Sequence, residues 1–248
     1  MDYNSYRFKK GEWVRCLLPG AMLLGCISFL FYRSVYAFLA GLPFLALYMR
    51  SRKKVCIKKR KETLTRQFQD AISAFSGALS VGYSVENAWR EAYRDMQLLY
   101  DEEADIMKEL SGMLRQLDNN AVLENLLLDF ARRADVPDIC DFAEVFSVAK
   151  RSGGDLSAMI QNTVDAISDK IEVKREIQVS LASRTYEQSV MNVIPLAMIA
   201  YISISSPHYF DPLYHNAAGV VIMTGCLLLY AAAYALSQRL LQDIFRKI

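Results

Sequence analysis

Four long apolar runs dominate the pattern of hydrophobic and polar positions along the chain. They extend from Cys16 to Tyr32, from Val35 to Met49, from Val190 to Ser206 and from Ala217 to Leu236. A helix needs about 20 apolar residues to cross a bilayer core about 30 Å thick. We interpret the runs as four membrane spans: a tight transmembrane hairpin over residues 16–49, and a transmembrane helix pair over residues 186–236 with a short external loop at 207–216.

Two other interpretations of the amino-terminal hairpin remain open. The Val35–Met49 run is short for a span, although local thinning of the bilayer can absorb the mismatch. A buried hairpin of a soluble protein is one alternative, but uncharged runs of this length are rare in water-soluble folds. A cleaved signal peptide is the other, and the basic residues before Cys16 fit it. Cleavage would leave the basic segment that follows on the wrong side of the membrane, so we favour the hairpin.

Between these two apolar pairs, residues 62–185 have the periodicity of helices. Apolar residues recur at spacings of three and four, and short connections separate the stretches. The apolar positions are Phe68, Ile72, Phe75 and Leu79, then Val122, Leu123, Leu126, Leu127 and Phe130, then Ile139, Phe142, Ala143 and Phe146, and finally Leu156, Ile160, Val164, Ile167 and Ile171. The pattern predicts an all-α fold with an antiparallel six-helix bundle. The sixth helix begins at Asp155 and is expected to continue without a break into the membrane.

Composition and charge agree with a protein that has both membrane and aqueous parts. With 53% hydrophobic and 23% charged residues, the chain is too apolar for an ordinary soluble protein and too charged to lie wholly in lipid. The basic juxtamembrane segment 50–61 has no acid, and the amino end 1–15 and the tail 237–248 carry an excess of Lys and Arg. The external loop 207–216 has neither residue. By the positive-inside rule, both termini and the bundle are predicted to be cytoplasmic in a multi-pass membrane protein.

The basic segment 50–61 also indicates which partners to expect. Lys and Arg next to a span attract anionic lipid headgroups, so membrane lipid is an expected partner. No aromatic residues for base stacking are interleaved with the cations of segment 50–61, so no nucleic acid is expected.

Two predicted junctions between helices have nearly the same sequence. Gly82 is followed two residues later by Ser84, and the pair Gly153 and Gly154 leads to Asp155. Glycine adopts the left-handed conformation that ends a helix, and Ser or Asp accepts hydrogen bonds from the first N–H groups of the next helix. We therefore predict two tight helix junctions here. Pro195, inside the third span, is expected to bend or loosen that helix.

No catalytic residue, cofactor site or metal site is predicted from residue types. The five cysteines are scattered and contain no CxxC motif. His208 and His215 are the only histidines and lie in the external loop, so a Ser–His–Asp or Cys–His arrangement is not expected on the cytoplasmic side. The acidic segment Asp101–Glu109 is open to three interpretations: a solvated helix start, a site for a hard cation, or a surface for a basic partner.

Three stretches resemble a known family. The stretch from Ile72 to Trp89, ISAFSGALSVGYSVENAW, resembles the first signature of the type II secretion system F domain. The stretch from Val122 to Ile177 resembles the second, with its Arg-rich helix end, its SGGD junction and its long final helix. NVIPLAMIAY, from Asn192 to Tyr201, resembles the membrane helix that follows. One copy of the domain between two pairs of spans is most similar to the platform proteins of the tight-adherence (Tad) pilus.

The resemblance implies a function that is not enzymatic. Platform proteins of this family lie in the inner membrane, engage a hexameric secretion ATPase and help to lift pilin subunits into a filament. A single copy of the domain implies pairing with itself or with a sister platform protein. The candidate partner contacts are Arg132, Arg133, Arg151, Lys174, Arg175 and Arg184, for which a solvated helix face is the alternative. A membrane-anchored signalling or scaffold protein is the alternative function, although its external loops would be very short.

Overall fold

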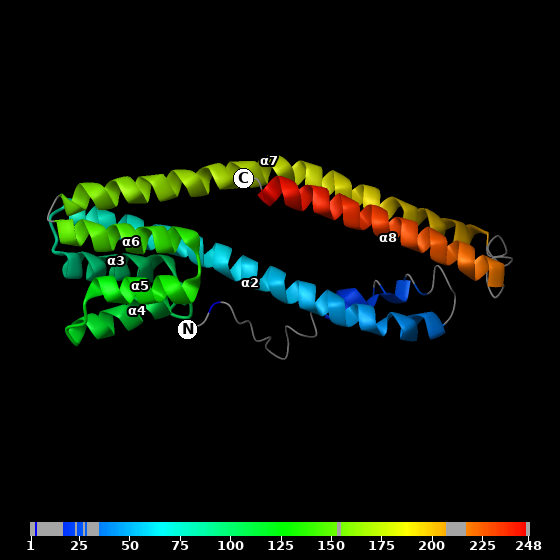
Figure 1. Ribbon diagram of the computed structural model, residues 1–248, viewed down its shortest axis with the longest axis horizontal. Helices are drawn as coiled ribbons and strands as arrows, with labels where there is room; N and C mark the ends of the chain where they lie inside the picture. The colour runs from blue at the N-terminus through cyan, green and yellow to red at the C-terminus, as the bar shows by residue number, and fades with distance from the viewer. Residues whose placement is uncertain are drawn as a thin grey trace. The chain divides into compact units, whose positions relative to one another are not determined.

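The computed structural model of the protein describes residues 3, 17–22, 24–26, 28, 35–152, 155–206 and 217–246. Over these ranges the fold is all-α, as predicted, and no residue belongs to a strand. The helices are α2 (Val35–Ser80), α3 (Val85–Leu99), α4 (Asp105–Asp118), α5 (Leu123–Ala134), α6 (Pro137–Ser152), α7 (Leu156–Ser205) and α8 (Ala217–Arg246) (Figure 1). A shorter apolar helix covers Leu17–Cys26.

The chain divides into two compact units. The first, which we call the core unit, comprises Met1–Arg7 and Lys53–Val173. The second, which we call the apolar unit, comprises Phe8–Arg52 and Lys174–Ile248. Both α2 and α7 contribute residues to each unit, because the division falls inside these two helices. Each unit is described separately below.

The core unit buries a continuous hydrophobic interior that takes side chains from α2 to α6 and from the first part of α7. Figure 1 shows α3, α4, α5 and α6 lying alongside one another. The apolar stripes predicted for α2 and α6 are fully buried, which confirms their orientation. The stripe predicted for α5 is wrong at its first position: Val122 precedes the helix and is 49% exposed, because its backbone is extended there.

Aromatic rings fill the centre of this interior. The ring of Phe68 lies edge-on to that of Phe142, with centroids 5.5 Å apart, and Phe75 meets Trp89 in the same manner at 5.1 Å. Edge-to-face contacts place the positive ring edge on the negative ring face, which adds about 0.5–1.5 kcal/mol to the gain from burial. Because the rings come from α2, α3 and α6, they fix these helices against one another.

Ion pairs join the helices around the hydrophobic interior. The pairs are Arg60–Asp105 at 2.6 Å, Lys61–Asp135 at 2.8 Å, Lys150–Glu124 at 3.1 Å and Lys170–Asp138 at 2.5 Å. Arg60 and Lys61 are the last two residues of the basic segment that was expected to contact lipid. The structure instead directs these two side chains to carboxylates of the core unit, so the expectation of lipid contact is left to the residues before them.

The apolar unit contains the helices that could cross a membrane. Within the described residues, α7 and α8 contain stretches that are long and apolar enough to do so. The predicted spans Val190–Ser206 and Ala217–Leu236 fall mainly within these helices. The Tyr230 hydroxyl of α8 donates a 2.6 Å hydrogen bond to the Asn192 carbonyl of α7, so the two helices are in contact. The first predicted span lies partly outside the described residues, and the second forms the start of α2.

Candidate functional site

The junction between α2 and α3 has the geometry that was predicted for Gly82. Its φ is +98°, in the left-handed region. Its N–H donates to the Leu79 carbonyl at 3.0 Å, and the N–H of Tyr83 donates to the Ala78 carbonyl at 3.3 Å. These two bonds form the Schellman motif, which satisfies carbonyls that the end of a helix otherwise leaves open. Glycine ends α2 here at no steric cost.

Ser84 stands at the predicted N-cap position, but its side chain does not act as predicted. Its φ of −62° and ψ of 155° are those of an N-cap residue, and its carbonyl accepts the first helical bond, from the Ala88 N–H at 2.7 Å. The side chain makes no capping hydrogen bond. The prediction of a hydroxyl cap is therefore wrong, because Ser84 contributes its backbone alone to the start of α3.

The second predicted junction is only partly described. Gly153 and Gly154 lie outside the described residues. Asp155 caps α7 as predicted, because its carboxylate Oδ1 accepts a 3.0 Å hydrogen bond from the Ala158 N–H. A carboxylate at a helix N-terminus also interacts favourably with the helix dipole.

A second Schellman motif lies at the end of α4, where the sequence pattern did not indicate one. Asn120 has a φ of +61°, and its N–H donates to the Leu117 carbonyl at 3.0 Å. The N–H of Ala121 donates to the Gln116 carbonyl, also at 3.0 Å. Among the described junctions, the one at Asn120 therefore has the same positive φ and the same pair of backbone hydrogen bonds as the one at Gly82. The signal was the Asn119–Asn120 pair, because Asn tolerates the left-handed region better than most residues do.

Pro195 lies inside α7, as predicted. Proline has no N–H, so the carbonyl four residues earlier loses its helical partner. The carbonyl of Asn192, on the next residue, accepts the hydrogen bond from Tyr230. The tyrosine of α8 therefore supplies a donor within one residue of the interrupted part of the helix.

Five of the six candidate partner contacts are exposed. They are Arg132 on α5, Arg151 on α6, and Lys174, Arg175 and Arg184 on α7. Arg184 forms a surface ion pair with Glu187 at 3.5 Å, which leaves most of both side chains in solvent. These five residues are available to a partner.

Arg133 is different, because its guanidinium is used inside the core unit. It donates to both oxygens of Glu109, at 2.7 and 2.8 Å, and to Asp129 at 2.7 Å. The Glu109 side chain is only 8% exposed. Burial alone would raise the pKa of Glu109, but the hydrogen bonds and charge of Arg133 outweigh it and lower the pKa. Arg133 is thus an internal bridge between α4 and α5, and we correct its assignment as a partner contact.

Tyr3 is a buried residue that sequence reasoning missed. It is 1% exposed, and its hydroxyl donates to Oε1 of Glu109 at 3.0 Å. Its ring lies edge-on to Phe130 at 6.5 Å, and the guanidinium of Arg60 lies 4.8 Å from the ring centroid. Burial, followed by the charge of Glu109, raises the pKa of Tyr3. No periodic pattern surrounds Tyr3 in the sequence, so nothing there indicated that it would pack.

The acidic segment Asp101–Glu109 provides little support for a cation site. Asp105 receives two hydrogen bonds from Arg60, at 2.6 and 2.7 Å, and Glu109 is bound by Arg133 and Tyr3. Its carboxylates at these two positions are neutralised by cations of the protein itself. Over the part of the chain that the structure describes, no group of three or more His, Cys, Asp or Glu residues could hold a metal ion.

Cys140 packs, partly buried, against the hydrophobic interior of the core unit, and its environment lowers its reactivity. Burial, followed by the charges of Asp135 and Asp141, raises the pKa of the thiol. Because the thiolate is the nucleophile, a raised pKa makes Cys140 slow to react. The arrangement therefore gives no activated thiol at this position.

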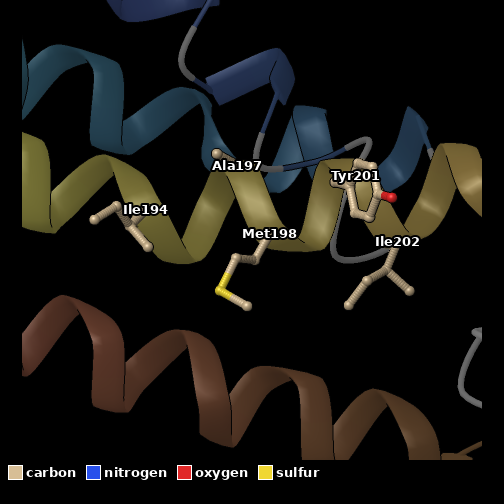
Figure 2. Close-up of a pocket in the computed structure, with 5 residues that line it drawn as sticks. All are labelled: Ile194, Ala197, Met198, Tyr201 and Ile202. Atoms are coloured by element: carbon tan, nitrogen blue, oxygen red, sulfur yellow. The ribbon is translucent and has the colours of Figure 1, made fainter.

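In the apolar unit, α7 carries a shallow groove of about 400 Å³. Its lining is almost wholly apolar and consists of Ile194, Ala197, Met198, Tyr201 and Ile202 (Figure 2). Figure 2 shows Met198 and Ile202 extending on the side of α7 along which α8 runs. The groove begins next to Pro195 and lies within the predicted span Val190–Ser206.

Comparisons of this chain with protein-family models, with curated proteins and with solved structures found no match.

Proposed function

We propose that the protein is an integral inner-membrane platform protein of a Tad or type IV-like pilus, or of a type II secretion assembly machine. In this proposal the core unit is a cytoplasmic, antiparallel six-helix bundle of the F-domain type. It engages a hexameric secretion ATPase, and the protein couples the movement of that ATPase to the extraction of pilin subunits from the bilayer. The role is mechanical rather than enzymatic.

The observation that supports this proposal best is the continuity of α7. Ile160, Val164 and Ile167, near its start, are buried in the core unit. The same helix continues to Ser205 and includes the apolar stretch that is long enough to cross a membrane. Because every turn of a helix is held by backbone hydrogen bonds, such a connection transmits force better than a loop does. A machine that moves subunits out of the membrane requires this kind of link.

The quoted motifs give the proposal its specificity. Of the junction residues that carry the resemblance, Gly82 adopts a left-handed conformation and Asp155 caps the long helix. The candidate contacts for the ATPase or for a sister platform protein are exposed cations: Arg132 and Arg151 in the core unit, and separately Lys174, Arg175 and Arg184 in the apolar unit. Pairing of the protein with itself or with that sister remains part of the proposal, because one copy of the domain is present.

Gene deletion tests the proposal directly. Loss of the protein should stop filament assembly while pilin subunits continue to be synthesised and inserted into the membrane. Quantitative immunoblotting of pilin in membranes and in sheared filaments separates the two effects. Normal filaments in the deletion strain, in the absence of a second platform gene, would contradict the proposal.

A further inference from the structure

The corner between α3 and α4 exposes apolar side chains next to acids that have no cation partner. Leu98 is 86% exposed and Leu99 is 66% exposed, although both belong to the core unit. The acids that follow them in the loop are also exposed, and no ion pair within the described part of the chain engages them. We call these residues the acidic corner: Leu98, Leu99, Asp101, Glu102 and Glu103.

The part of α2 with which the core unit begins has the opposite charge. We call residues 53–59 the basic stretch. Its lysines, at positions 53, 54, 58 and 59, are exposed, and Val55 between them is 56% exposed. Among the described residues, the ion pair that engages these lysines is a 4.0 Å contact between Lys58 and Glu62, in which the lysine side chain stays 75% exposed. The basic stretch therefore complements the acidic corner in charge, and both carry exposed apolar side chains.

Two contacts hold the acidic corner against α2, directly after the basic stretch. Arg60, which follows the stretch, donates to both carboxylate oxygens of Asp105, just beyond the corner, at 2.6 and 2.7 Å. The Tyr100 hydroxyl, inside the corner loop, donates to Asp70 of α2 at 2.5 Å. The corner and the stretch are thus neighbours on one surface, yet within the described residues no ion pair joins them in a single copy. A surface fixed in this way loses little conformational entropy on docking.

We propose that the acidic corner of one copy docks on the basic stretch of a second copy, and the reverse, in a two-fold dimer of the core unit. An interface of this isologous type requires a surface that complements itself. A half-turn about an axis between the corner and the stretch brings each of them to its counterpart. Leu98, Leu99 and Val55 supply the apolar contact area, because ion pairs that stay in solvent contribute little affinity. The charges fix the register of the two copies.

The inference rests on the self-pairing that is part of the proposed function, and it assigns a surface to that pairing. It involves neither the ATPase nor pilin, so the purified full chain tests it, whereas filament assembly tests the platform function. The two can therefore fail separately. The inference also gives the basic stretch a protein partner in place of the lipid headgroups that the sequence suggested. These two occupants can be distinguished, because lipid binding does not require the acidic corner.

Charge reversal on each side of the contact tests the docking. Full-length copies with two different affinity tags are co-expressed and purified in detergent, and recovery of one copy through the tag of the other measures pairing. The double variant Lys58→Glu, Lys59→Glu should lower this recovery at least about tenfold, because acids then face acids in both contacts. The double variant Asp101→Lys, Glu102→Lys should lower it to the same extent. Co-expression of one chain of each kind should restore wild-type recovery, because both contacts again join opposite charges.

Matched variants elsewhere on the core unit control for net charge and for exposed apolar area. Arg115→Glu with Arg151→Glu should pair as the wild type does, since both arginines are exposed and lie in the last turns of α4 and α6. Along α4, Arg115 is roughly 15 Å from the corner end. Leu98→Ser should weaken pairing, whereas Val81→Ser, at a residue that is 78% exposed, should not. Circular dichroism verifies that each variant keeps its helices.

Wild-type chains that do not recover each other would overturn the proposal. So would charge-reversed chains that pair normally, or whose pairing is not restored by mixing the two kinds. Vesicles of phosphatidylglycerol test the alternative occupant. If the Lys58→Glu, Lys59→Glu variant lost vesicle binding but kept its pairing, lipid and not a second copy would occupy the basic stretch, and the proposal would be wrong.

Discussion

Arg132 and Arg133 are neighbours on α5, but only Arg133 directs its guanidinium to Glu109. The forked guanidinium bonds both carboxylate oxygens, a geometry that lysine does not reproduce. The sequence alone does not distinguish the two arginines, since both follow the same apolar stripe. Their directions about the helix axis decide which one packs inside the core unit. At the residue scale, burial and not residue type therefore assigns the role.

Arg133→Ala should lower the free energy of unfolding by about 2 kcal/mol, because it leaves the carboxylate of Glu109 buried without its main cation. The estimate is below the range for a fully buried pair since the Arg133 side chain is 30% exposed. Chemical denaturation in detergent measures the loss. The adjacent exposed residue provides the control: Arg132→Ala should change stability by less than about 0.5 kcal/mol. Equal losses in the two variants would contradict the assignment.

The lowered pKa of Glu109 also predicts how the free energy of unfolding depends on pH. Its pKa is lower in the folded protein than in the unfolded chain, where it is about 4.3. Its contribution is therefore complete above the unfolded value and is lost as the pH falls through the lowered folded value. Compared with the wild type, Glu109→Gln should show a weaker loss of stability on acidification below about pH 4. Identical acid profiles of the two proteins, measured by thermal unfolding, would contradict this account.

Gly77, inside α2, and Gly82, in the junction that follows α2, allow a second comparison of two matched substitutions. Beyond the adjacent residues and the backbone of the helix itself, no heavy atom lies within 4 Å of where a Cβ would be added at Gly77 or at Gly82, so neither substitution creates a clash with a packed neighbour. Gly82→Ala should nevertheless destabilise the protein by about 1 kcal/mol, because of its left-handed backbone. Gly77→Ala, inside the helix, should stabilise it by about 0.5–1 kcal/mol. Unfolding measurements that give both changes the same sign would show that the backbone conformation does not decide the outcome.

At the element scale, the helices were the most predictable part of the fold. Apolar residues three and four positions apart located the stripes of α2, α6 and α7, because burial of one face selects this spacing. The continuity of α7 was also expected, since no helix-breaking residue precedes Pro195. What could not be predicted depends on neighbours that are distant in sequence. The packing of Tyr3, the pairing of Arg60 with Asp105 and the internal role of Arg133 are all of this kind.

The helix junctions illustrate the same limit. Gly82 and Asp155 behave as their residue types suggest, since the required conformation or hydrogen bond is local. Ser84 has the backbone of a cap without its side-chain bond, which depends on rotamer and surroundings. Asn120 forms a motif that a search for glycine alone does not detect.

The two capping positions predict a difference in stability. Asp155→Ala should cost about 1 kcal/mol, because the Ala158 N–H loses its acceptor. Ser84→Ala should cost less than about 0.5 kcal/mol, because no side-chain bond is removed. Thermal unfolding of the two variants gives the comparison. A larger loss at Ser84 than at Asp155 would contradict the observed hydrogen bonding.

At the scale of the whole molecule, the account combines an all-α core unit with helices that are long and apolar enough to span a membrane. The described residues of the core unit have a buried aromatic interior, internal ion pairs and an exposed set of cations. They suit a protein whose task is to hold partners and to transmit movement, which is the function proposed above.

Co-purification from native membranes tests this central claim most directly. After gentle crosslinking and detergent extraction, the wild-type protein should bring down a hexameric secretion ATPase. The double variant Arg132→Glu, Arg151→Glu, at two exposed cations of the core unit, should recover much less of it, whereas Arg94→Glu, a charge reversal at another exposed arginine of that unit, should recover the wild-type amount. Absence of any secretion ATPase from the crosslinked wild-type complex would contradict the account.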